Sequence, residues 1–134
     1  MNPAKIEVRF ADCDLMGHVN NAVYLSYFEQ ARMHCFQYIL DEQWDWKENG
    51  IILVKNEVSY LKPVFLHDKP SIFVYLDEIG TKSFTLSYVM KVKDDVVAEG
   101  KSKLVCFDFT KNQSVEVYPT MKKALEQLPK LTKQ

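Results

Sequence analysis

Apolar and charged residues alternate strictly near the start of the chain. Ile6, Val8 and Phe10 occupy every second position, and charged residues stand beside them. Side chains on a β-strand point alternately to its two faces, so this pattern is typical of a strand with one buried face. We therefore predict a half-buried strand over residues 5–10.

The apolar spacing then changes from every second residue to every third or fourth. Tyr24, Phe28, Ala31 and Cys35 follow this helical spacing, and amide and charged residues tend to lie elsewhere. We predict a helix over residues 21–41, about 30 Å long at ~1.5 Å per residue. Its aromatic residues on more than one side indicate a helix enclosed by a sheet and by a partner subunit.

Strand-like segments joined by short turns fill most of the remaining chain. They are predicted at residues 52–61, 71–77, 83–92 and 96–109. In the last segment Ala98, Gly100 and Ser102 share one face, and such small residues allow a bulky element such as a helix to approach the sheet. A short final helix is predicted to begin at Pro119, because proline is favoured at the first helical position.

This order of elements predicts the fold class. One strand, one long helix and then at least four strands favour the α+β class, with an antiparallel sheet wrapped on the helix. At 134 residues the chain is long enough to bury a core of its own, and it contains no repeat or low-complexity segment. We expect a single domain over residues 1–134.

Charge and composition exclude several classes of protein. Seventeen basic and eighteen acidic residues give a net charge of −1 without a basic stripe, so nucleic acid is not an expected partner. The apolar stretches are far shorter than the ~20 residues of a membrane span, and the first residues lack a secretory signal. Three widely spaced cysteines suggest neither a disulfide framework nor a zinc site. We expect a cytoplasmic protein with reduced thiols and no membrane partner.

The densest polar cluster runs from Asp12 to Asn21, directly before the predicted helix. A calcium loop does not fit, because its closing acid would fall at Val23. A thiol nucleophile does not fit either, because negative charge on both sides of Cys13 opposes thiolate formation. A turn with Asn20 or Asn21 as the helix N-cap explains any one of these residues, but not so many together.

A helix start that follows carboxylates suits the transfer of an acyl group to water. The unpaired N–H groups there stabilise an oxyanion on a substrate carbonyl, and one such donor lowers the barrier by ~3 kcal/mol. A carboxylate just before the helix can act as general base or as nucleophile. Asp12 and Asp14 both qualify, since alternation places them on the same side of the chain.

The segment RFADCDLMGHVNNAVYLSYFEQAR, residues 9–32, resembles the hotdog-fold thioesterases of the 4-hydroxybenzoyl-CoA thioesterase-like group. These proteins share the pattern D-x-D-x-x-G-H-x-N-N-x-x-Y-x-x-x-x-E-x-A-R, and a softer likeness covers essentially the whole chain. The resemblance implies a long helix wrapped by a curved antiparallel sheet of five or six strands. It also implies homodimers or homotetramers with active sites at the subunit interface, and neither a metal nor an organic cofactor.

By the same resemblance, Asp14 is the catalytic carboxylate. The residues that line or order the site are His18, Asn21 and Tyr24, and the substrate-binding positions of the motif are Gly17 and Asn20. The family hydrolyses a thioester between an acyl group and coenzyme A or an acyl-carrier pantetheine. The aryl-CoA enzymes of the group carry apolar and aromatic residues at positions 18, 20 and 21, so we favour aliphatic or broad acyl-CoA substrates here.

Residues outside the motif are candidates for binding the rest of the substrate. Because coenzyme A carries phosphates, we expect Lys62 and Lys82 near the mouth of the site, with Ser83 as a hydrogen-bond donor. Ser59 is expected to meet the site of a partner subunit. The leading function is an acyl-CoA thioesterase. The alternatives are an acyl-ACP thioesterase, a hotdog dehydratase or hydratase, and a non-catalytic acyl-CoA-binding protein.

Overall fold

The computed structural model describes residues 2–131. In chain order the elements are β1 (Ala4–Lys5), the 3₁₀ turn η1 (Phe10–Asp12), α1 (Val23–Ile39), β2 (Gly50–Tyr60), β3 (Ser71–Ile79), β4 (Ser83–Val92), β5 (Asp95–Asp108), β6 (Gln113–Ser114) and α2 (Pro119–Glu126). The strands form one antiparallel sheet in the order β1-β3-β4-β5-β2, and β6 pairs with β5. Neither helix of the described residues is long and apolar enough to cross a membrane.

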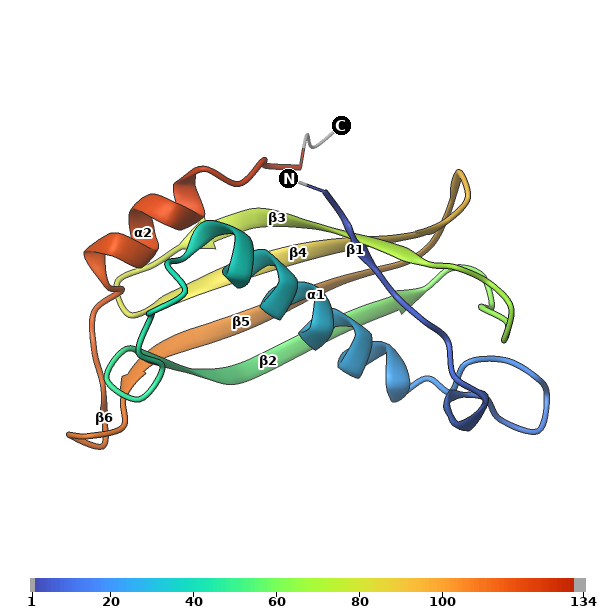
Figure 1. Ribbon diagram of the computed structural model, residues 1–134, viewed down its shortest axis with the longest axis horizontal. Coiled ribbons are helices and arrows are strands. Elements are labelled where there is room, and N and C mark those ends of the chain that lie inside the picture. The colour runs from blue at the N-terminus through green and yellow to red at the C-terminus, as the bar shows by residue number, and fades with distance from the viewer. Residues whose placement is uncertain (1, 132–134) are drawn as a thin grey trace.

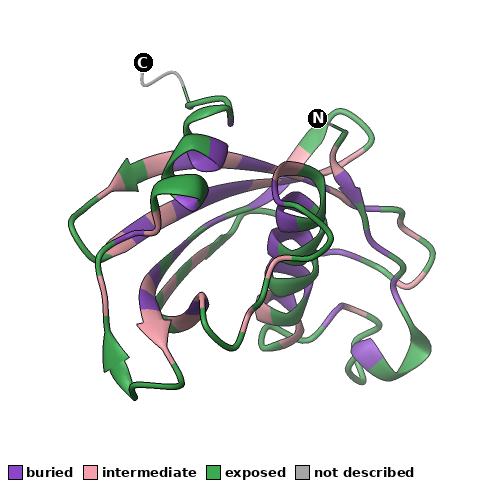
Figure 2. Cartoon of the chain, turned by 60° about the vertical axis from the view of Figure 1, so that its left-hand side comes forward, coloured by how far each residue is buried: buried purple, intermediate pink, exposed green. Residues whose placement is uncertain are grey.

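The sheet curls around α1, which runs along its concave side (Figures 1 and 2). Figure 2 shows buried positions on the helix and on the strand segments that surround it. This is the α+β hotdog architecture that the sequence predicts. Its consequence for function is that the polar segment before α1 lies at one end of the sheet, beside the end of β2 (Figure 1).

Close contact between α1 and β5 depends on the small residues predicted to share one face. The ring of Phe28 stacks on Tyr88 of β4, with 4.6 Å between the ring centroids and 11° between the ring planes. A Cβ atom at Gly100 would lie 2.7 Å from Cε2 of Phe28, which is closer than real Cβ contacts allow. Ala98 and Ser102 on either side are fully buried. The prediction that this face admits the helix is therefore confirmed.

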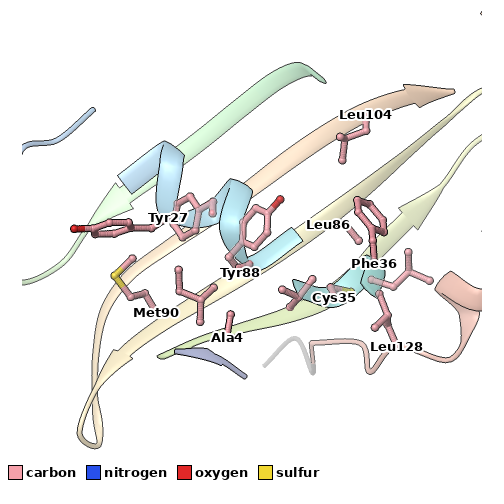
Figure 3. Packing of buried hydrophobic residues seen from close by; sticks show 14 of the residues in the cluster. Ala4, Tyr27, Cys35, Phe36, Leu86, Tyr88, Met90, Leu104 and Leu128 are labelled. Carbon is pink, nitrogen blue, oxygen red and sulfur yellow. The ribbon is translucent and has the colours of Figure 1, made fainter. Parts of the chain in front are cut away.

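The apolar core extends along the whole length of α1. Figure 3 shows Tyr27, Cys35 and Phe36 of the helix in one layer with Leu86 and Tyr88 of the sheet. All five side chains are at most 2% exposed. The helical spacing read from the sequence therefore marked the buried side of α1 correctly.

Of the first predicted strand, residues 5–10, only Lys5 lies in an observed strand. Only Ala4–Lys5 pairs with the sheet, although Ile6 and Val8 are buried as the alternation predicts. Phe10 is 83% exposed, because the chain turns there into η1, closed by the bond from the Asp12 N–H to the Arg9 carbonyl. Alternation thus described two side chains correctly and failed where a local turn replaced the strand.

The other predicted elements agree with the structure. β4 matches its predicted range, and the ends of α1, β2, β3 and β5 differ from prediction by at most two residues. α2 begins at Pro119, and its apolar residues Met121 and Leu125 are fully buried.

Candidate active site

The polar segment before α1 folds into a small hairpin. Cys13 and Val19 form an isolated antiparallel bridge, and the Asp14 N–H donates to the His18 carbonyl at 2.8 Å. Gly17 closes the turn with a φ of +80°, a conformation that other residues rarely adopt, and its N–H donates to the Asp14 carbonyl at 3.0 Å. These bonds give the loop, residues 13–19, a fixed conformation directly before the helix.

The Asp14 carboxylate belongs to this loop and is exposed to solvent. Its Oδ1 atom accepts the Met16 N–H at 2.9 Å and the His18 N–H at 3.3 Å. Within residues 2–131, no protein donor uses the other oxygen, Oδ2. One oxygen therefore holds the side chain in place, and the second is available to a water molecule or a substrate.

Asp12 has the opposite environment. It is 2% exposed, and its carboxylate accepts the Tyr27 hydroxyl at 2.6 Å and the Arg9 backbone N–H at 3.0 Å. The Arg9 guanidinium adds an ion pair at 3.0 Å. Burial by itself raises the pKa of Asp12, but the hydrogen bonds from Tyr27 and Arg9 outweigh it and leave the pKa below its ordinary value.

Only one of the two acids is therefore free for chemistry. The expectation that Asp12 and Asp14 lie on the same side of the chain is wrong, since η1 turns the first inward against α1 and leaves the second in solvent. Asp12 is a structural clamp between the hairpin and the helix.

This clamp makes the stability of the protein depend on pH. A carboxyl with a lowered pKa in the folded state contributes stability above its unfolded pKa of about 3.9, and loses it as the pH falls through the folded value. The free energy of unfolding is therefore expected to drop below about pH 4, and Asp12→Asn removes part of that drop. Urea unfolding of both proteins between pH 7 and pH 3 measures it. A difference in stability that stays constant over that range would contradict the assignment.

Asn20 is not the N-cap of α1, contrary to the prediction. The helix starts at Val23 after Ala22, and the Asn20 Oδ1 atom accepts the Ala22 N–H at 2.9 Å. Asn21, the other predicted cap, is also outside the capping position. The Asn20 side chain therefore shapes the turn into the helix by bonding to the backbone two residues on, and Asn21 is exposed.

The first turn of α1 keeps a donor free. The Val23 N–H donates to the Asn20 carbonyl at 3.0 Å and the Leu25 N–H to the Ala22 carbonyl at 3.3 Å. Between these two, the Tyr24 N–H has no acceptor within residues 2–131. It is an unpaired donor at the positive end of the helix dipole.

Two aromatic side chains support the motif residues. Tyr60, at the end of β2, donates its hydroxyl to the Asn21 carbonyl at 2.8 Å, and its ring meets Tyr24 edge-on at 4.8 Å. Phe65 meets the His18 ring edge-on at 4.9 Å. Tyr24 is buried, and this burial raises its pKa. Tyr60 and Phe65 are not among the predicted site residues, since aromatic residues of a strand and a loop are usually core residues.

The structure brings the motif residues together at this end of the molecule. The hairpin, the turn that follows it and the first turn of α1 together hold Asp14, Gly17, His18, Asn20, Asn21 and Tyr24. Lys62 is at the same end, where it pairs with Asp95 at 3.4 Å.

Three predicted substrate-binding residues lie elsewhere in the chain. Lys82 and Ser83 are at the other end of the sheet, since Ser83 pairs with Val105 whereas Tyr60 pairs with Ala98. Ser59 alternates with Tyr60 and therefore faces away from α1. Within one chain, these three do not meet the Asp14 loop.

Comparison with known proteins identifies the family. The model of the thioesterase-like superfamily matches residues 8–125, which include the hairpin, α1, the whole of β2 to β5 and all but the last residue of α2. The chain belongs to the thioesterase-like superfamily. Thioesterases are enzymes, so this chain is a thioester hydrolase by family membership.

Individual thioesterases are similar over nearly the whole chain. The long-chain acyl-CoA thioesterase FadM of Escherichia coli (strain K12) is 30% identical over 94% of this chain and 98% of its own. The 1,4-dihydroxy-2-naphthoyl-CoA hydrolase of Nostoc punctiforme is 28% identical over 82% of this chain and 76% of its own. A thioesterase from Thermus thermophilus, solved with coenzyme A and Zn, is 28% identical with a TM-score of 0.82 over 93% of this chain and 91% of its own.

Proposed function

We propose that this thioesterase hydrolyses acyl-CoA thioesters to a free acid and coenzyme A, with Asp14 as the catalytic carboxylate. The observation that carries the proposal is the free Oδ2 atom of Asp14 on the loop directly before α1, whose first turn leaves the Tyr24 N–H unpaired within residues 2–131. The similarity to FadM supports acyl-CoA as the substrate.

The chemistry follows from these two groups. The Tyr24 N–H polarises the thioester carbonyl and stabilises the oxyanion that forms on it. As general base, Asp14 takes a proton from water while the water oxygen bonds to the carbonyl carbon; the C–S bond then breaks and the proton passes to the leaving sulfur. As nucleophile, the Asp14 oxygen instead bonds to the carbonyl carbon while the C–S bond breaks and CoA leaves as a thiolate. Water then hydrolyses the acyl anhydride to the free acid and restores the Asp14 carboxylate, and the released proton goes to the thiolate. The loop and the helix start are held in place by the His18 ring on Phe65, by the Tyr60 hydroxyl bonded to the Asn21 carbonyl, and by the Tyr24 ring on Tyr60.

Thiol release tests this function directly. The parent protein is incubated with acyl-CoAs of increasing chain length, with aromatic acyl-CoAs and with an acyl-ACP. Release of CoA from acyl-CoAs is the expected result. Thiol release from acyl-ACP alone would show that the substrate is carried by acyl-carrier protein and not by CoA. Hydration of an enoyl-CoA without thiol release would indicate a dehydratase or hydratase. Binding without any reaction would indicate a non-catalytic protein.

We further propose a homodimer joined through β2, as the unit from which any tetramer is built. β2 is 11 residues long and pairs with β5 along one edge, whereas no strand of residues 2–131 pairs with its other edge. Leu53 and Val54 are exposed on it. Long exposed edges with apolar residues favour pairing with a second chain.

We also propose a cytoplasmic location.

The charges on β2 select the register of this pairing. Lys55 and Glu57 are exposed neighbours on one face of the strand, 3.0 Å apart. A two-fold axis through Asn56 places each Lys55 opposite Glu57 of the partner subunit, whereas an axis through Lys55 would place two lysines opposite each other. The axis through Asn56 also places Tyr60 opposite Ile52 of the partner subunit, so opposite ends of the two sheets meet.

Reversing one of these charges is expected to weaken the dimer. Lys55→Glu sets carboxylates opposite each other twice, which raises the dissociation constant about ten-fold or more at low salt. The double variant Lys55→Glu/Glu57→Lys restores opposite charges and with them the affinity. Sedimentation equilibrium at two salt concentrations measures both. Equal dissociation constants for the parent and the single variant would exclude this register.

A further inference from the structure

A buried cation lies in the middle of α1. The Arg32 guanidinium pairs with Glu29 at 3.7 Å, and the Glu29 side chain is exposed. One guanidinium nitrogen, Nη1, also donates to the Tyr88 hydroxyl and to the Ser102 hydroxyl, both at 3.3 Å. Burying a charge with so distant a counter-ion costs free energy. The chemistry proposed at Asp14 does not use this charge, so its contacts indicate another role.

The chemistry of Arg32 fixes the direction of the hydrogen bonds that follow it. A guanidinium has N–H donors and no acceptor, so the Ser102 oxygen accepts the Arg32 N–H. The Ser102 hydroxyl has a single proton, and the Asn56 Oδ1 atom of β2 lies 2.6 Å away. That distance is typical of an O–H···O bond and shorter than N–H···O bonds usually are. The Asn56 oxygen therefore points toward Ser102, and the amide nitrogen Nδ2 points away from it.

The two N–H groups of this amide meet no acceptor within residues 2–131. Asn56 is half-buried near the centre of β2, on the face that meets α1, because Ser102 opposite it on β5 is fully buried. β2 is the last strand in the sheet order β1-β3-β4-β5-β2. The amide donors therefore lie at the edge where the second subunit is proposed to pair.

We infer that Asn56 bonds to its own copy across the two-fold axis of the dimer, and that Arg32 and Ser102 set the direction of its amide. The inference rests on the proposed dimer through β2 and not on the chemistry at Asp14. Residues directly opposite each other in an antiparallel pair have Cβ atoms about 4.5–5.5 Å apart, within reach of an amide–amide hydrogen bond. Each Nδ2 atom donates to the Oδ1 atom of the opposite amide, which has a second lone pair beside the one that Ser102 uses.

The amide pair selects the register of the two chains. A paired asparagine stabilises the register in which both amides are bonded, because any other register leaves their donors unsatisfied. The charges of Lys55 and Glu57 select the same axis, although they lie on the opposite face of the strand. Arg32 is a positioning residue in this arrangement, since it acts on Asn56 through Ser102.

Cysteine cross-linking tests whether Asn56 lies on the axis. Asn56→Cys subunits are expected to form a disulfide-linked dimer on oxidation, because Cβ atoms directly opposite each other come within reach of a disulfide. Peptide mass spectrometry distinguishes this bond from any made by Cys13, which is partly exposed. Val58→Cys is the matched control on the same face of β2, because its two copies lie on opposite sides of the axis and stay unlinked.

The dissociation constant tests the amide bonds themselves. Asn56→Ala removes both of them and is expected to raise the dissociation constant of the dimer about ten-fold. Ser59→Ala is the matched control, because Ser59 is exposed on the same strand and faces away from α1. Sedimentation equilibrium at about 0.5 M salt measures both variants under conditions that screen the charges of Lys55 and Glu57.

Exchange of the amide protons tests the role of Arg32. In the parent dimer, the side-chain amide of Asn56 is expected to exchange with water about ten-fold more slowly than that of Asn112, which is exposed. Arg32→Met removes the N–H that orients Ser102 and keeps a good helix former of similar length, so it is expected to lose most of this protection. Nuclear magnetic resonance measures the exchange. Ser102→Ala serves if Arg32→Met fails to fold.

Each contrary outcome has its own meaning. A dimer of Asn56→Ala as tight as the parent, or no cross-link at position 56, would overturn the amide pair and leave a β2 dimer of another register. An Asn56 amide that exchanges as fast as that of Asn112 is bonded to water, which would also overturn it. Unchanged protection in Arg32→Met would overturn the role of Arg32. A parent that remains monomeric would remove the proposed dimer itself, before any variant is made.

Discussion

Replacing Asp14 with asparagine is expected to lower kcat on the best acyl-CoA substrate by about 10²–10⁴-fold, the usual contribution of a general base. Asparagine keeps an Oδ1 atom, so the hydrogen bonds from the Met16 and His18 N–H groups persist and the hairpin keeps its shape. The free Oδ2 atom is replaced by an amide that neither takes a proton nor attacks a carbonyl. Because Asp14 is exposed, the free energy of unfolding is expected to stay within about 0.5 kcal/mol of the parent.

Asp12→Asn is the matched control, two residues away. It removes the charge that binds Tyr27 and Arg9 in a buried position, which costs about 1.5–3 kcal/mol of stability at pH 7. Its kcat is expected to change far less than that of Asp14→Asn. Steady-state kinetics and urea unfolding on both variants separate the two roles. Full activity in Asp14→Asn would move the catalytic base to another group.

Gly100→Ala is expected to destabilise the protein by about 1–3 kcal/mol through overpacking. The added Cβ meets Cε2 of Phe28 at 2.7 Å and the Glu57 carbonyl oxygen at 3.0 Å. The φ of Gly100 does not lie in the left-handed region, so the cost comes from the contact with α1 and not from the backbone. Urea unfolding at pH 7 measures it.

A second-site change shows whether Phe28 is the cause. Phe28→Leu removes the ring that the new Cβ meets, so the double variant Gly100→Ala/Phe28→Leu is expected to be more stable than the sum of the single effects predicts. Gly80→Ala is the control, since the nearest atom to its Cβ is the Ser83 hydroxyl at 3.2 Å, in an exposed turn. Strict additivity in the double variant would contradict the contact between Gly100 and Phe28.

Local periodicity was sufficient for most of the fold. Side-chain spacing depends on the geometry of the element itself, so Tyr24, Phe28 and Ala31 identified the buried side of α1 without knowledge of what covers it. The same reasoning placed β4 at its observed ends. It failed at Phe10, where a hydrogen bond between Arg9 and Asp12 turned the chain out of the strand.

The sequence by itself determined the α+β class, the long helix, the small face of β5 and the polar segment that carries the family motif. Only the tertiary structure separated Asp12 from Asp14. The two acids have the same local propensities. Their difference comes from Tyr27, which is fifteen residues further along the chain than Asp12. Its hydroxyl donates to the Asp12 carboxylate, and the Asp14 carboxylate has no such partner within residues 2–131. The structure likewise placed Ser59 and Lys82 away from the hairpin, because strand pairing between distant segments decides which ends and faces meet.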